Sequence, residues 1–118
     1  MKTYLAIFTG SPDSPNNVKW KALDDATRKK KEAAGMAAWG NWAAKNQKSI
    51  LEMGGPCGKT KKIDASGISD IRNQIAAFTV VQAESYDEAA KLFLDHPHFA
   101  IFPGDSVEVM EILPIPGR

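Results

Sequence analysis

The sequence contains little cysteine, little histidine and little net charge. Its single cysteine, Cys57, cannot form a disulfide within the chain, so packing must hold the fold, as is usual in a reducing compartment. The 15 basic and 14 acidic residues nearly cancel and leave +1, which gives no overall electrostatic reason to bind nucleic acid or a membrane surface. No segment approaches the ~20 apolar residues of a membrane-spanning helix.

The first residues, MKTYLAIFTGSPDSP, also lack the features of a secretory signal, because the apolar part is short and no small-residue cleavage site follows. We therefore expect a cytoplasmic protein. A length of 118 residues, with 43% apolar and 25% charged residues, suits one globular domain with one core. The prediction is a single domain over residues 1–118, with neither nucleic acid nor membrane as partner.

Hydrophobic periodicity and turn residues predict six elements of secondary structure. They are a strand at 2–8, a helical region at about 18–53, strands at 59–65 and 76–84, a helix at 85–96 and a strand at 106–113. The lysine-rich strand 59–65 suits the edge of a sheet, and residues 66–75 are predicted to be a connection. Ser85, with Glu88 three residues later, forms a capping box for the second helix, and Pro97 is predicted to end it.

The long helical region is predicted to begin with VKWKAL, to start a new helix at a capping Asp24 or Asp25, and to stop at Gly54 and Gly55. On a helical wheel one sector forms the expected core face, with Trp39 at its edge and Trp42 well outside it. The residues of that sector are Ala33, Met36, Gly40, Ala43, Gln47, Ile50 and Leu51.

The order β-α-β-β-α-β is that of a ferredoxin-like α+β fold, an antiparallel sheet with two helices on one face. Strands 2–8 and 76–84 are apolar on both of their faces, whereas helices cover one face of such a sheet. A second copy of the sheet is the most economical cover for the other face, so we predict a homodimer. A large ligand is the alternative cover.

Three stretches of the sequence resemble the YCII-related family, in the group of dimeric α/β barrels. They are AWGNWAAKNQKSILEMGGPCGKTKKIDASGISDIRNQIAAFTVVQAES, DEAAKLFLDHPHF and SVEVMEILPIPG. The resemblance implies a two-subunit barrel, with the open face of each sheet turned inward and a pocket near each barrel mouth. Such barrels host lactone isomerisation, dehalogenation, oxygenation of aromatics and haem degradation, and the fold alone transfers none of these reactions.

The sequence also departs from the family pattern. The resemblance implies a pocket histidine in the N-terminal part of the chain, paired with an aspartate, but residues 1–95 contain no histidine. The Asp-Gly-Pro-Phe stretch of a related branch is replaced by DASGISD. The His–Asp pair of the family therefore has no counterpart at matching positions.

Both histidines lie in FLDHPHFAIFPGD, residues 93–105. Either His96 or His98 is a candidate general acid or base, because imidazole titrates near neutral pH. Asp95 or Glu108 is the candidate carboxylate partner. Glu108 and Glu111 lie on opposite faces of the last strand, so one of them points away from the helices. The structural alternative is that His96 caps the end of the second helix and His98 is a surface loop residue, with diverging rings.

Arg72 and Asn73 are candidates for binding a carboxylate or carbonyl of a ligand. The structural alternative is that Arg72 pairs with Asp70 or Glu84. Three aromatic residues are candidates to wall a small-molecule pocket, although a core or a dimer interface is the more frequent use of such residues. These residues are Tyr4, Trp39 and Phe102.

Other motifs support no site. A metal ion needs three or four ligands, and too few lie near the histidines. GGPCGKT has the wrong glycine spacing and context for a phosphate loop, Cys57 has no neighbouring base, and RKKK suits a solvated helix face. We expect neither metal nor cofactor.

The sequence leaves three hypotheses for the function. The first is a homodimeric enzyme that acts by acid/base chemistry on a small organic acid or lactone-like molecule. The second is a non-catalytic dimeric binding module, and the third is a haem-binding monooxygenase.

Overall fold

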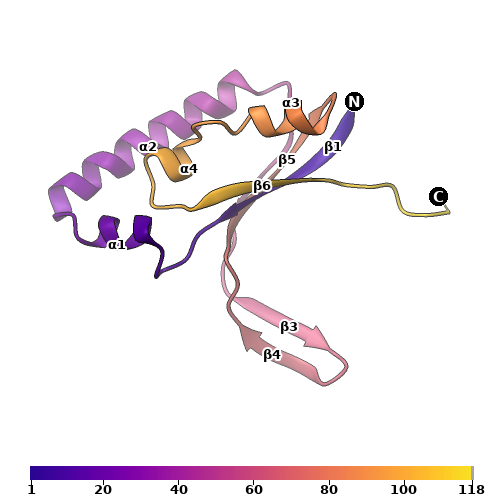
Figure 1. The fold of residues 1–118 in the computed structure, drawn as a ribbon, viewed down its shortest axis with the longest axis horizontal. Helices are drawn as coiled ribbons and strands as arrows, with labels where there is room; N and C mark the ends of the chain where they lie inside the picture. Colours follow the sequence, from indigo (N-terminus) through magenta and orange to yellow (C-terminus); the bar gives the residue numbers. More distant parts are fainter. Residues whose placement is uncertain (118) are drawn as a thin grey trace.

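The computed structural model describes residues 1–117, which form a four-stranded antiparallel sheet, a separate two-stranded hairpin and four helices (Figure 1). The elements are β1 Lys2–Thr9, α1 Pro15–Lys21, α2 Asp25–Lys45, β2 Ile50–Pro56, β3 Thr60–Asp64, β4 Gly67–Ile71, β5 Ile75–Ala83, α3 Tyr86–Lys91, α4 Pro97–Ala100 and β6 Ser106–Glu111. The sheet order β2-β5-β1-β6 is consistent with the predicted ferredoxin-like fold.

The predicted helical region 18–53 is wrong in its extent. Ser14 caps a first helix, α1, by accepting the backbone N–H of Asn17, and residues 50–56 form the strand β2. A new helix, α2, does begin at the predicted cap Asp24. The short run ILEMGGP has no helical or strand periodicity of its own. Its conformation is decided by pairing with the apolar strand β5, which lies beyond the reach of a local pattern.

Gly54 shows why the glycine pair is part of a strand and is not a helix stop. Its φ of +67° is rarely adopted by other residues, and a Cβ there would lie 2.1 Å from the carbonyl oxygen of Phe78. Glycine therefore allows β2 to approach β5 closely through an irregular register.

The buried face of α2 also differs from the prediction. Gly35 is buried, and Trp39 and Trp42 pack against the core, whereas Met36 is 66% exposed. Gly35 lies directly under the ring of Phe102, which a Cβ would meet at 2.5 Å. The predicted core face points in a different direction because its helical wheel includes residues 50 and 51, which belong to β2.

Residues 60–64 are a strand, as predicted, but they do not join the main sheet. They pair with 67–71, a segment predicted to be a connection, to form the β3–β4 hairpin. The hairpin projects away from the sheet and the helices (Figure 1).

The second predicted helix, 85–96, is divided. Ser85 caps α3 as predicted, its Oγ accepting the N–H of Glu88, but α3 ends at Lys91. A turn follows in which Asp95 adopts a φ of 54°, and Pro97 begins α4 rather than ending α3. Proline suits the first position of a helix, because its missing N–H would have no partner there.

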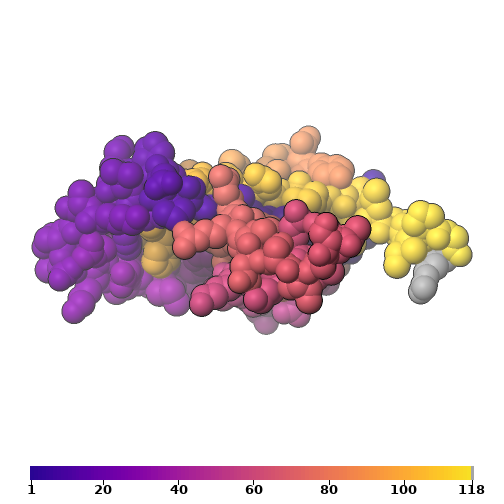
Figure 2. Space-filling view, turned by 90° about the horizontal axis from the view of Figure 1, so that it is seen from below, coloured from indigo at the N-terminus to yellow at the C-terminus, as the bar shows by residue number. Residues whose placement is uncertain are grey.

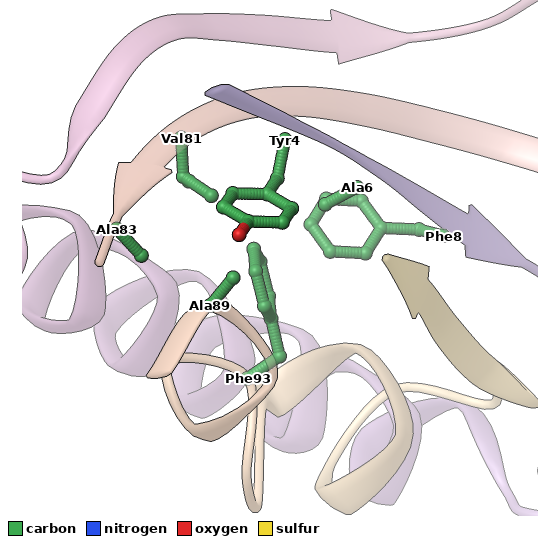
Figure 3. Packing of buried hydrophobic residues seen from close by; sticks show 7 residues of the cluster. All are labelled: Tyr4, Ala6, Phe8, Val81, Ala83, Ala89 and Phe93. Atoms are coloured by element: carbon green, nitrogen blue, oxygen red, sulfur yellow. The ribbon is translucent and has the colours of Figure 1, made fainter. Parts of the chain in front are cut away.

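The core lies between the sheet and the helices, where alternate side chains of β1 and β5 meet α3 and the following turn (Figure 3). It comprises Tyr4, Ala6, Phe8, Val81, Ala83, Ala89 and Phe93. The remaining apolar side chains of the central strands point to the opposite side, as predicted, and we call this surface the open sheet face. It includes Leu5 and Ile7 of β1, Phe78 and Val80 of β5, and Met110 of β6. The molecule is accordingly thin, 55 × 43 × 19 Å.

Candidate functional site

The predicted site residues fall into two separate regions. His96 and His98 lie with Phe8, Trp39 and Trp42 between the sheet and the helices, and we call these five residues the imidazole cluster. Arg72 and Asn73 line a groove at the base of the β3–β4 hairpin.

His96 is fully buried and serves as the N-cap of α4. Its Nδ1 accepts the backbone N–H of His98 at 3.0 Å, so the ring proton of the neutral imidazole is on Nε2. The ring is stacked on Phe8 at 5.1 Å and lies edge-on to Trp39 at 4.5 Å and Trp42 at 4.6 Å. Its Nε2 has no hydrogen-bond partner among residues 1–117, and the surrounding aromatic faces offer a weak acceptor surface at most.

The enclosure of the His96 ring by other side chains disfavours its protonated, charged form. Burial, with a smaller contribution from the nearby His98, lowers the pKa of His96 to about 4. The imidazole is therefore neutral at physiological pH, and neither of its nitrogens is available to exchange a proton with a ligand in this conformation.

His98 is also held inside, with 7% of its surface exposed. Its Nε2 donates to the carbonyl oxygen of Thr9 at 2.7 Å, and its ring covers Gly104, where a Cβ would lie 2.2 Å from Nε2. Burial lowers the pKa of His98, while the bond to Thr9 and the charge of Asp105 act in the opposite direction. Because Nε2 carries the proton, Nδ1 retains the lone pair.

The structural alternative for the two histidines is therefore wrong in its details. His96 caps the start of α4 and not the end of α3, His98 is buried rather than on a surface loop, and both rings contact Phe8 instead of diverging. No local pattern could predict this arrangement, because the contacts come from Phe8 of β1 and Trp39 of α2.

The two predicted carboxylate partners lie elsewhere. Asp95 is exposed in the turn before α4 and makes no hydrogen bond to either imidazole among the described residues. It borders, with Asp105, a second groove of about 470 Å³ between α3 and β6. Glu108 is opposite Ile7 on the open sheet face, on the far side of the sheet from the imidazole cluster, and is thus the one of Glu108 and Glu111 that points away from the helices.

The three predicted aromatic residues pack on the helix side of the sheet. Tyr4 is fully buried and lies 5.0 Å from Tyr86, and burial followed by the charge of Glu111 raises the pKa of Tyr4. Phe102 is 6.2 Å from Trp39 and shields Gly35. These aromatic rings fill the space between sheet and helices, where the sequence left a core and a ligand pocket as alternatives.

The groove at the hairpin base is the larger of the two hollows, with a volume of about 970 Å³. Its walls are the loop after β1, the hairpin and the segment leading into β5. They comprise Gly10–Asp13, Gly58–Lys61 and Asp70–Ile75. Figure 2 looks at the molecule from the hairpin side, where the hairpin forms the central projection.

Hydrogen bonds between different segments hold the base of the groove together. Asn73 accepts the N–H of Ile75 at 2.9 Å and donates to the Oγ1 of Thr60 at 3.2 Å, which ties the two ends of the hairpin together. Gly10 donates its N–H to the carbonyl of Gln74 at 2.9 Å, which fixes the loop after β1 against the same segment.

The groove carries a net positive charge, since the cations Lys59, Lys61 and Arg72 line it together with the carboxylates Asp13 and Asp70. Lys61 is paired with Asp70 at 2.5 Å, whereas Lys59 and Arg72 form no ion pair with any carboxylate of residues 1–117. The predicted structural alternative, in which Arg72 pairs with Asp70 or Glu84, is therefore wrong. Sequence reasoning missed Lys59 and the 10–13 loop, because it took 66–75 for a simple connection and did not see a hairpin.

Within the part of the chain that the structure describes, no three His, Cys, Asp or Glu side chains gather in a way that would hold a metal ion. Across residues 1–117 no helix has the length and apolar character needed to span a bilayer.

No profile of a known protein family matches the chain, and no curated protein matches it. Among solved structures, its fold is similar to that of 5-chloro-2-hydroxyhydroquinone dehydrochlorinase (TftG) from Burkholderia phenoliruptrix AC1100, in complex with 2,5-dihydroxybenzoquinone. The two sequences are 18% identical, the TM-score is 0.52, and the match covers 92% of this chain and 90% of that one. At this identity the similarity concerns the fold alone.

Proposed function

We propose that this protein is a cytoplasmic homodimer of the dimeric α/β-barrel group that binds a small anionic organic molecule in the groove at the hairpin base. The observation that carries the proposal is Arg72, a cation on the wall of a groove of about 970 Å³ without a carboxylate partner among residues 1–117. A guanidinium binds a carboxylate or a similar planar oxyanion through two parallel hydrogen bonds.

The other walls of the groove suit an organic ligand with an apolar body. Pro12, Ile71 and Ile75 supply apolar surface, and Lys59 adds a second cation. A carboxylated or hydroxylated ring would place its oxygens on the cations and its ring against the apolar residues. The solved structure of similar fold holds 2,5-dihydroxybenzoquinone, a small oxygenated ring, and this makes that compound a reasonable probe here.

The homodimer is supported by the open sheet face. Its central strands carry Leu5, Ile7, Phe78 and Val80, which the helices leave uncovered. A contiguous apolar surface over a whole sheet is unusual for a monomer in water, and a second sheet of the same kind would cover it.

The histidines favour the binding-module hypothesis over the enzyme hypothesis. His96 and His98 each make a defined contact to backbone, and burial lowers the pKa of both. An acid/base role for His98 is the second candidate, because the ring bonds the carbonyl of Thr9, the residue before Gly10 of the groove. Asp105, and not Asp95 or Glu108, is the carboxylate whose charge acts on that ring.

Titration calorimetry with benzoate and with 2,5-dihydroxybenzoquinone tests the proposal. We expect Arg72→Gln to weaken binding at least about tenfold, since a charge-assisted bond contributes roughly 1.5–3 kcal/mol. The control is Lys29→Gln, which removes one exposed cation of α2 outside the groove. Equal affinities in the wild type and Arg72→Gln, or no binding of either probe by the wild type, would contradict the proposal.

The same titration, repeated in buffers of different ionisation enthalpy, separates the two candidates. The acid/base candidate predicts proton uptake or release on binding that is lost in His98→Gln, a variant whose amide can still donate to the Thr9 carbonyl. The binding module predicts no such dependence on His98.

A further inference from the structure

The β3–β4 hairpin carries apolar side chains that its own subunit leaves in water. We call residues 59–72 the arm. Ile63 and Ile68 are directly opposite each other near its tip and are 71% and 73% exposed. The arm projects away from the rest of the subunit (Figure 1). A two-stranded hairpin is marginally stable in water without a packing partner, so we expect another surface to pack against the arm.

The two isoleucines share one face of the arm. Residues opposite each other in an antiparallel pair, and alternate residues along each strand, point to the same side. Ile63 and Ile68 therefore share a face with the ion pair of Lys61 and Asp70. Both members of that pair also line the groove, so a partner seated on this face would border the groove.

The open sheet face is the second uncovered apolar surface of the same chain, and its charge is opposite to that of the arm. Its ionisable residues are Glu52 of β2 and Glu108 of β6, which lie on the two edge strands and flank the apolar centre. The arm has four cations and two carboxylates. These are Lys59, Lys61, Lys62 and Arg72, with Asp64 and Asp70.

We propose that the arm of one subunit packs beside the paired sheets, along an edge of the open sheet face of a second copy of this chain, with its isoleucines toward the apolar side chains of that face and its cations toward the acidic edge strands. The inference rests on the homodimer of the proposed function and not on its ligand. A two-fold arrangement would exchange two arms and so cover both kinds of surface in each subunit. It also provides partners for Glu52 and Glu108, whose burial without a cation would be costly.

Sedimentation velocity from micromolar to millimolar concentration tests the inference on the full chain. The arm variant is Ile63→Ser with Ile68→Ser, and its exposed positions allow the subunit to fold. The control is Met36→Ser with Leu94→Ser, two residues of the helix side that are 66% and 70% exposed. We expect the arm variant to raise the dimer dissociation constant at least about tenfold, as for central apolar contacts of an interface, and the control to leave it unchanged.

A monomeric wild type, an arm variant that dimerises like the wild type, or equal weakening by the control overturns the inference. Glu108→Gln locates the contact. It weakens the dimer if arm cations face Glu108, whereas unchanged or tighter association excludes this placement on the sheet. Benzoate titration of the wild type is independent of these results, so loss of the ligand proposal and loss of the arm contact are told apart.

Discussion

The imidazole cluster and the hairpin groove hold their polar side chains in opposite surroundings. In the cluster, aromatic rings exclude water, and the two imidazoles are held by bonds to the His98 N–H and the Thr9 carbonyl. In the groove, Arg72 and Lys59 are hydrated and have no carboxylate partner among the described residues. The residue types most often associated with catalysis therefore contribute to packing here, while the groove proposed to bind a ligand is built from ordinary loop and hairpin residues.

The largest expected effect comes from removing the centre of the imidazole cluster. His96→Ala leaves a cavity among Phe8, Trp39 and Trp42 and removes the N-cap of α4. We expect the free energy of unfolding to fall by about 3–4 kcal/mol, measured by chemical denaturation. Benzoate affinity should stay unchanged at temperatures where the variant is folded. A loss below about 1 kcal/mol would mean that the ring is not packed as described.

A slightly smaller effect is expected from pH, and it isolates the charge of His96 from its packing. The pKa falls from 6.5 to about 4 on folding, so between these values the unfolded chain takes up a proton that the folded protein excludes. The free energy of unfolding should therefore decrease as the pH is lowered from 6.5 toward 4, by about 3 kcal/mol in total, and stay constant with respect to this group above 6.5.

His96→Asn provides the control for this pH dependence. Asparagine is a preferred N-cap and can accept the same N–H from His98, but it does not titrate. The difference in unfolding free energy between wild type and His96→Asn should change with pH over this range, because the carboxylates contribute to both proteins alike. A difference that is constant from pH 4 to 7 would contradict the assigned burial of the charge.

The same contrast explains which parts of the molecule could be predicted from the sequence. The strands β1 and β5 and the cap at Ser85 follow from local patterns, and all three were predicted, the strands to within one residue at each end. The strand at 50–56 was not, since its conformation depends on pairing with β5 across about 25 residues. The surroundings of His96 depend on Phe8 and α2, so the sequence could name the residue but not its burial.

The groove residues show the opposite case, because two of them were named from the sequence and lie where a ligand could reach them. Arg72 and Asn73 were selected as ligand-binding candidates from a polar run, and the structure places both on the groove, whose other walls come from 10–13 and 58–61. A turn at 65–66 followed by alternating residues was the available signal for the hairpin, and it is weak because the strands are polar and five residues long.

The smallest expected effect comes from the exposed ion pair of the groove. Asp70→Asn breaks the 2.5 Å contact with Lys61, but both side chains are largely in water, at 67% and 79% exposed. The free energy of unfolding should change by less than about 0.5 kcal/mol. Because the substitution leaves Lys61 unpaired in the groove that Arg72 also lines, benzoate should bind about twofold more tightly at low salt, and the gain should vanish as salt screens the added charge. The matched control is Asp64→Asn, which removes an arm carboxylate 3.4 Å from Lys62 and outside the groove walls. If both variants change the benzoate affinity equally, the ligand responds to the overall charge of the arm and not to a particular cation in the groove wall. The charge of the groove would then be a property of the whole arm, and the contrast with the neutral, packed imidazole cluster would not depend on individual groove residues.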